Sequence, residues 1–231
     1  MDTKRLDYVV LSHPHPDHMN GLKYILANFE VGEFWESGFP CNSADYSAIK
    51  HTLSARHIPV RKINAATPAI AIGDTRIEPL APFACNESFS ENSDEDVNNS
   101  SLVFRLKYGK FAILFTGDIG SATEQALVRH PQQLSCTVLK VPHHGSRFSS
   151  TLPFLAAAAP KIALISAGYG NSFGLPSRQT ILRLENLGVK VYRTDLDKTI
   201  EVLCNQDKLT VSTFEESRNL SDLGMNLLRE W

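Results

Sequence analysis

The sequence predicts a layered α/β fold with mixed sheets, and three observations support this class. Short apolar runs alternate with segments in which apolar residues recur at helical spacing, which indicates strands that alternate with helices. Two of the apolar runs follow one another closely around Gly109-Lys110, as in a hairpin, so antiparallel pairs are expected beside parallel ones. The chain of 231 residues shows no repeat and no linker, and a chain of this length can form one domain.

The part of the chain before residue 81 predicts short strands and two helices. The apolar run from Leu6 to Leu11 predicts a buried strand. Apolar residues at positions 19, 22, 25, 26 and 29 predict a helix over 18–29. A second helix is expected over 44–57, because the residue before Pro59 disfavours helical backbone. Further strands are expected at 33–36, 60–63, 69–72 and 76–80.

Residues 84–100 interrupt this pattern. They are rich in Asn, Ser, Asp and Glu and contain few apolar residues. We therefore expect a loop here, with its acidic run forming a solvated surface.

Regular elements return after residue 100. Strands are predicted at 101–108 and 111–116, on either side of Gly109-Lys110. The predicted helices are 121–129, 151–158 and 177–187, and the predicted strands are 136–141, 161–166, 190–193, 199–203 and 208–213. Gly188 would cap the last helix. We expect one domain over 1–214 and a polar tail over 215–231.

Composition excludes several classes of protein. The net charge of −2 gives no global basic field for nucleic acid, although a local basic patch stays open. The four cysteines, Cys41, Cys85, Cys136 and Cys204, form no C-x-x-C motif, which favours reduced thiols in a cytoplasmic protein. No run approaches the roughly 20 apolar residues of a spanning helix, and the N-terminus lacks the apolar stretch of a signal peptide. The chain as given is expected to be soluble and to contain no membrane segment.

The segment His13-Pro14-His15-Pro16-Asp17-His18 follows the first predicted strand directly. The two prolines stiffen the loop, and residues two apart in extended backbone face the same side. Imidazole nitrogens and carboxylate oxygens are good ligands for zinc, manganese or iron. Three histidines and one aspartate at this spacing therefore predict a metal site.

This H-x-H-x-D-H loop after an apolar strand resembles the signature of the metallo-β-lactamase superfamily. The resemblance implies a four-layer αββα fold that carries two divalent metal ions, Zn or Mn, and activates water for hydrolysis. It implies that His13 and His15 bind one metal ion and that Asp17 and His18 bind the other. Asp118, at the end of the apolar run 111–116, matches the aspartate that bridges both ions in that family.

Another strand end carries two adjacent histidines, in Val141-Pro142-His143-His144-Gly145-Ser146. By the same resemblance, one of them is the last metal ligand, and the other lies beside the substrate as a hydrogen-bond donor or proton carrier. We favour His143 as the ligand and His144 as the catalytic neighbour, together with Asp17.

Four further segments narrow the resemblance to one branch. Asn98-Asn99-Ser100-Ser101-Leu102, Thr116-Gly117-Asp118, Val141 to Ser146 and Tyr192-Arg193-Thr194-Asp195 occur in an order similar to the hydrolase domain of the ComEC family of DNA-uptake proteins. The match covers most of residues 6–203.

That branch implies a nuclease that hydrolyses DNA phosphodiesters beside a membrane channel partner, on the outer face of the inner membrane. Asn99, Ser146 and Arg193 would contact the substrate. Lys140 and Arg147 are further candidate phosphate contacts, since cationic side chains suit phosphate oxygens.

Three departures from the family pattern bear on activity. Asn98-Asn99-Ser100 stands where many members carry a third histidine for the first metal ion. Leu175 stands where this branch carries a histidine, and leucine can neither ligate nor transfer a proton. The histidine loop arrives at residue 13, so we expect a domain that lacks its N-terminal strands.

Two alternatives stay open. One is a different hydrolase of the same superfamily: a choline-phosphate esterase, lactonase or thioesterase. The other is a truncated domain that binds metal or DNA without hydrolysing it, which Leu175 and the short N-terminus would explain.

Overall fold

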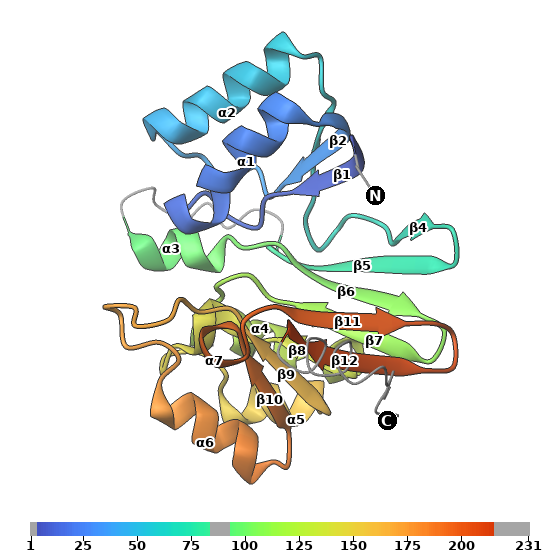
Figure 1. Cartoon of the computed structure of the whole chain (residues 1–231), viewed down its shortest axis with the longest axis vertical. Coiled ribbons are helices and arrows are strands. Elements are labelled where there is room, and N and C mark those ends of the chain that lie inside the picture. Colours follow the sequence, from blue (N-terminus) through green and yellow to red (C-terminus); the bar gives the residue numbers. More distant parts are fainter. Residues whose placement is uncertain (1–3, 84–92, 215–231) are drawn as a thin grey trace.

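The computed structural model describes residues 4–83 and 93–214. Its first unit is a three-stranded parallel sheet in the order β1-β2-β3, formed by Arg5–Val10, Glu30–Glu36 and Val60–Lys62. The helices α1 (Pro16–Asn28) and α2 (Ala44–Ala55) connect these strands and pack on one another (Figure 1). Apolar residues of both helices and of the sheet form one buried cluster, which includes Met19, Leu26, Phe34, Ile49 and Leu53.

The second unit is a seven-stranded mixed sheet in the order β10-β9-β8-β7-β6-β5-β4. Its strands are β4 (Ile70–Ile72), β5 (Thr75–Ala81), β6 (Val103–Tyr108), β7 (Phe111–Phe115), β8 (Val138–Lys140), β9 (Ile162–Ile165) and β10 (Lys190–Arg193). Strands β4 to β7 are antiparallel and β7 to β10 are parallel. The parallel half uses the helices α4 (Ser121–Val128), α5 (Leu152–Ala158) and α6 (Arg178–Asn186) as connections.

Helices cover the two sheets from outside, as the expected αββα order requires. Figure 1 shows α1 and α2 above the small sheet, and α5 and α6 at the opposite end of the molecule. Trp35 of β2 and Ile63, just after β3, lie in one buried cluster with Ile77 of β5 and Leu102, just before β6, so the two sheets share a core. The hairpin β11 (Ile200–Cys204) and β12 (Leu209–Thr213) packs through a further cluster on the parallel half.

The predicted helices and strands are present, with a shift of a few residues at most at their ends. The prediction that the first strand is buried is wrong: β1 lies at the edge of the small sheet, and Val9 is its only buried residue. The hairpin around Gly109-Lys110 is present, and Gly109 has a φ of +56°, a conformation that glycine adopts without strain. Among the described residues, no helix has the length and the apolar composition that crossing a membrane requires.

The prediction of a loop over 84–100 is wrong for its last part. Residues Asp94–Asn99 form helix α3, and residues 84–92 lie outside the described residues. Ser93 caps this helix by accepting a hydrogen bond from the Asp96 amide, and acidic residues fill its first turn, where the helix dipole favours them. The apolar periodicity that identifies longer helices is missing here, because α3 buries Asn98 and Asn99. The predicted tail over 215–231 also lies outside the described residues.

Candidate metal centre

The histidine loop lies where β1 gives way to α1. Pro16 is the first residue of the helix, where a fixed φ is favourable and no amide hydrogen is needed. The amide of His18 donates to the carbonyl of His15, so the first helical turn begins inside the motif. This turn presents Asp17 and His18 together, and the loop before it carries His13 and His15.

Asp118 lies just beyond the end of β7 and meets this loop. Gly117 before it has a φ of +51°, and a Cβ atom there would lie 2.6 Å from the Ser101 side chain. Glycine is therefore required at 117 both for backbone conformation and for space. The Asp118 amide donates to the Ser101 hydroxyl at 3.0 Å, and this hydrogen bond fixes the position of the Asp118 backbone.

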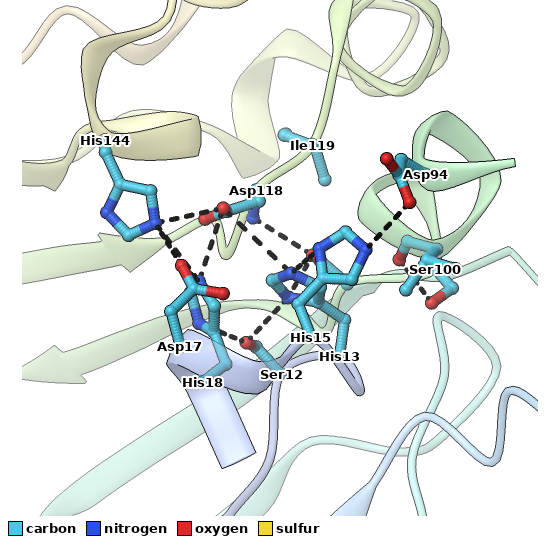
Figure 2. Close-up of polar contacts among 12 residues, drawn as sticks. Ser12, His13, His15, Asp17, His18, Asp94, Ser100, Asp118, Ile119 and His144 are labelled. Carbon is cyan, nitrogen blue, oxygen red and sulfur yellow. Dashed lines mark hydrogen bonds and ion pairs between the residues drawn. The ribbon is translucent and has the colours of Figure 1, made fainter. Parts of the chain in front are cut away.

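Four side chains from three strand ends converge on one point (Figure 2). Ligand atoms of Asp17, His18, Asp118 and His144 all lie within 4.8 Å of one another. The Nε2 atom of His144 is 3.1 Å from Oδ2 of Asp118 and 3.2 Å from Oδ2 of Asp17. The Nε2 atom of His18 is 3.3 Å from the same Asp118 oxygen. The structure thus brings Asp17, His18 and Asp118 together with His144 rather than with His143, the residue that the sequence favoured.

The donor set of this cluster fits a divalent cation. Asp118 is 3% exposed, and its Oδ1 atom has no hydrogen-bond partner among the described residues. A buried carboxylate oxygen without a partner is costly, and a bound cation would satisfy it. Burial alone would raise the pKa of Asp118, but hydrogen bonds from His144 and His18 outweigh burial and lower that pKa far below its usual range.

A backbone carbonyl orients the imidazole of His144. Its Nδ1 atom lies 2.7 Å from the Ser166 carbonyl oxygen, so it donates there and leaves Nε2 for a ligand. An acceptor of this kind commonly supports a metal-binding histidine. Sequence reasoning missed Ser166, because a backbone carbonyl at the end of β9 leaves no mark in the residue types.

His13 and His15 form a second group against the same aspartate. His13 is buried, and its Nε2 atom lies 3.2 Å from Nδ1 of His15 and 4.0 Å from Oδ2 of Asp118. Burial lowers the pKa of His13 to about 3, which favours the neutral imidazole that metals bind. Ser101 lies 3.1 Å from its Nδ1 atom and so links His13 to the Asp118 amide. Ser101 lies two residues before β6, and sequence reasoning did not assign it this linking role.

The two adjacent histidines point to different places. His143 and His144 have φ values of +48° and +51°, so both adopt left-handed backbone, which is strained for residues other than glycine. His144 joins the group of four, whereas His143 lines a cleft with Asn98, Asp118 and Phe148. The sequence favoured the opposite assignment, with His143 as the ligand and His144 as the catalytic neighbour.

The predicted substrate contacts are engaged within the protein. Oδ1 of Asn99 accepts hydrogen bonds from the Gly120 amide at 2.9 Å and from the Thr123 hydroxyl at 2.8 Å. The Ser146 hydroxyl accepts from the Phe148 amide at 3.3 Å.

The predicted cationic contacts have internal partners as well. The Arg193 guanidinium pairs with both oxygens of Asp195, at 3.1 and 2.6 Å. Lys140 donates to the Val141 carbonyl, and burial lowers the pKa of its ammonium. Arg147 is exposed, and its guanidinium carbon lies 4.7 Å from the centroid of the Phe148 ring.

Leu175 lies in a second cleft, which Asp17, His144 and Phe173 also line. Asn171 holds the backbone of this segment. Its Oδ1 atom accepts from the Leu175 amide at 3.1 Å, and its Nδ2 atom donates to the Leu175 carbonyl at 2.6 Å. Leu175 therefore lines a cleft beside the metal cluster, on a loop that the side chain of Asn171 holds in place.

Comparison with known proteins places this geometry in context. ComE operon protein 3 of Bacillus subtilis is 28% identical over 201 residues, which are 86% of this chain and 24% of that protein. Competence protein ComA of Neisseria gonorrhoeae is 31% identical over 199 residues, which are 86% of this chain and 25% of that protein. The chain thus spans about a quarter of the length of these relatives.

Solved structures and a family model agree on the fold. The CmlA β-hydroxylase E377D mutant matches with a TM-score of 0.52 at 14% identity, over 82% of this chain and 43% of that one. A candidate metal-dependent hydrolase from Parabacteroides distasonis matches with a TM-score of 0.51 at 14% identity, over 84% and 79%. The model of the beta-lactamase superfamily domain matches residues 1–163. With its αββα layers and its His/Asp cluster, the chain belongs to the metallo-β-lactamase superfamily and is a distant homologue of competence proteins.

Proposed function

We propose that this chain is a metal-dependent phosphodiesterase that cleaves DNA as part of a competence-type DNA-uptake system. The observation that supports this most is the convergence of Asp17, His18, Asp118 and His144, with a buried Asp118 oxygen that no protein group satisfies. Hydrolases of phosphate esters often use two metal ions held by such mixed imidazole and carboxylate sets.

In this proposal the site takes two divalent metal ions, zinc or manganese. Asp17, His18, Asp118 and His144 would hold one ion, and His13 and His15, together with Asp118, would hold the other. Bound there, the ions would supply a Lewis acid for a phosphate oxygen and an activated water. The Ser166 carbonyl keeps the His144 imidazole aimed at the site, and the Ser101 hydroxyl keeps Asp118 and His13 in register.

Two groups are available to the substrate itself. The side chain of Asp17 is 61% exposed, so its carboxylate can face the attacking water as well as the metal. His143 lines the cleft next to Asp118, where its imidazole can donate a hydrogen bond to a phosphate oxygen or carry a proton. We assign His143, together with Asp17, to this catalytic role.

The setting of the reaction is proposed from the relatives. Two of them are a ComE operon protein and a competence protein, and the chain covers only about a quarter of each. DNA is therefore the proposed substrate, and a membrane channel protein is the proposed partner, at the outer face of the inner membrane.

The test combines metal analysis with a substrate panel. Purified protein is expected to contain two equivalents of metal per chain and to hydrolyse bis-p-nitrophenyl phosphate with Mn²⁺ or Zn²⁺. Asp118→Ala should abolish both, whereas Asp74→Ala, an exposed aspartate in the turn between β4 and β5, should leave both unchanged. Hydrolysis of a lactone or of a choline-phosphate ester without phosphodiester hydrolysis would reject the proposal, as would protein that binds no metal.

A further inference from the structure

Two clefts open from the metal cluster, and each carries a strongly exposed aromatic ring. One cleft, of about 340 Å³, is lined by Asp118, His143, Asn98 and Phe148. The other, of about 280 Å³, is lined by Asp17, His144, Leu175 and Phe173. The clefts share no lining residue, and the neighbours His143 and His144 separate them.

From this arrangement we propose that the clefts hold the two nucleosides on either side of the scissile phosphate, with Phe148 and Phe173 as stacking platforms for unpaired bases. The substrate is then single-stranded nucleic acid. This inference rests on the proposed function, which places the phosphate at the cluster.

The size of the clefts suits single nucleosides. Both lie near the lower end of the range of roughly 300–1,000 Å³ that is typical of sites for small organic molecules. A base that remains paired in a duplex cannot enter one cleft while its neighbour enters the other. The geometry therefore requires a strand whose bases can leave the stack.

The two rings are placed as stacking platforms. The side chains of Phe148 and Phe173 are 67% and 83% exposed. A single exposed apolar side chain is ordinary on a protein surface, so exposure alone decides nothing. The decisive feature is position, because each ring lines a cleft that ends at the cluster. Phe173 lies on the loop between β9 and α6, which projects from the body below α3 in Figure 1.

An unsatisfied amide supports a base in the first cleft. Asn98 is 8% exposed, and its Oδ1 atom has no hydrogen-bond partner among the described residues. Such an acceptor is costly to bury, and an N–H group on the edge of a base would satisfy it. A phosphate could not, since it offers only acceptors.

Charge also favours bases over extra phosphates in this cleft. Glu95 lines it, and Asp94, Glu95 and Asp96 fill the first turn of α3. Negative carboxylates repel a phosphate but leave a neutral base unaffected. Arg147 is an exposed cation beside this cleft, and its guanidinium lies over the Phe148 ring. Binding should therefore depend on stacking more than on ion release, which agrees with the net charge of −2.

The experiment measures binding without catalysis. The full chain as purified, with its bound metal, is titrated into fluorescently labelled oligothymidylate with hydrolysis-resistant phosphorothioate linkages and into an abasic strand of equal length, charge and linkage. Wild type should bind the thymidylate at least tenfold more tightly than the abasic strand. Phe148→Ala and Phe173→Ala should each weaken thymidylate binding about tenfold, in line with the usual contribution of one base–aromatic stack. Phe148→Trp should retain it.

Controls separate stacking from loss of fold. Tyr24→Ala removes a ring that is 66% exposed and lines neither cleft, and should bind like wild type. The abasic strand should bind all variants equally. Equal binding of thymidylate and abasic strands to wild type, or phenylalanine variants that behave like Tyr24→Ala, would overturn the inference. Because neither strand is cleaved, the result stands apart from the hydrolysis assay, which decides the proposed function on its own.

Discussion

The Nε2 atom of His144 lies 3.1 Å from Oδ2 of Asp118, although the two residues follow different strands. Asp118 follows β7 and His144 follows β8, and these strands are parallel neighbours in the large sheet. The carboxyl ends of parallel neighbours meet at one edge, which explains why an apolar strand that runs into a polar loop is informative here. The same edge meets the loop after β1, so three strand ends supply the cluster.

Substitution of the two adjacent histidines should separate metal binding from catalysis. His144→Ala removes an atom of the four-residue group and should lower the metal content from two equivalents to about one. His143→Ala should keep both equivalents but lower kcat on bis-p-nitrophenyl phosphate, by about 10²–10⁴-fold if it carries a proton. Elemental analysis and initial rates measure the two effects.

The matched control is His51→Ala, which replaces an exposed histidine of α2. It should change neither quantity. Loss of a metal equivalent in His143→Ala together with full occupancy in His144→Ala would restore the assignment that the sequence favoured.

Asn99 should prove important for stability because it anchors the segment after Asp118. Its Oδ1 atom accepts from the Gly120 amide and the Thr123 hydroxyl, both at the start of α4. Asn99→Ala leaves two donors without an acceptor, which should lower the free energy of unfolding by about 1–3 kcal/mol. Asn99→Asp keeps the oxygen and should recover part of this loss. Urea denaturation at constant m measures both.

Asn98→Ala provides the neighbouring control for this experiment. The Oδ1 atom of Asn98 has no partner among the described residues, so its loss should cost less than the loss of Asn99. A larger effect at Asn98 than at Asn99 would show that the contacts at the start of α4 do not carry the stability.

Sequence reasoning named three of the four residues of the candidate metal cluster, Asp17, His18 and Asp118, as metal ligands, because their signal is local. The histidine loop and Asp118 each follow an apolar strand directly, and a strand end that carries ligand residues can be read from neighbouring positions. The choice between His143 and His144 could not be read this way, because it depends on two consecutive left-handed residues. The support from the Ser166 carbonyl depends on the pairing of β8 with β9, which residue types do not encode. Helix α3 was not predicted because its buried residues are Asn98 and Asn99, so the apolar periodicity that identifies a helix is missing.

The ion pair between Glu78 and Arg105 should make stability depend on pH. Arg105 donates to Oε2 of Glu78 at 2.8 Å through Nε, and the side chain of Arg105 is only 12% exposed and that of Glu78 19%. Burial alone would raise the pKa of Glu78, but the hydrogen bond and the positive charge of Arg105 outweigh it and lower that pKa. The stabilisation is therefore complete above the ordinary pKa of about 4.5 and is lost as the pH falls through the lower folded value.

The measurement for this pair is the free energy of unfolding of wild type and Glu78→Gln between pH 7 and pH 3. Glu78→Gln should be less stable by about 1 kcal/mol at pH 7, as is usual for a pair near the surface, and the difference should shrink below pH 4.5. Glu185→Gln, at an exposed position of α6, is the control. A difference that grows toward low pH would contradict the assigned sign.

Leu175→His should increase hydrolysis, because it places an imidazole in the cleft that Asp17 and His144 line. Asn171 holds both the amide and the carbonyl of residue 175, so the loop should keep its course when the side chain changes. An added proton donor beside the leaving group should raise kcat by about 10²-fold, the lower end of the usual range.

Leu175→Gln tests whether polarity alone suffices, since an amide can donate a hydrogen bond but cannot transfer a proton at neutral pH. If kcat on bis-p-nitrophenyl phosphate rises only for histidine, and its pH profile gains a limb near the ordinary histidine pKa of about 6.5, the leucine limits the rate of this chain. Equal rates for both variants would instead mean that proton transfer from this position is not limiting, and that His143 alone meets the need of the leaving group.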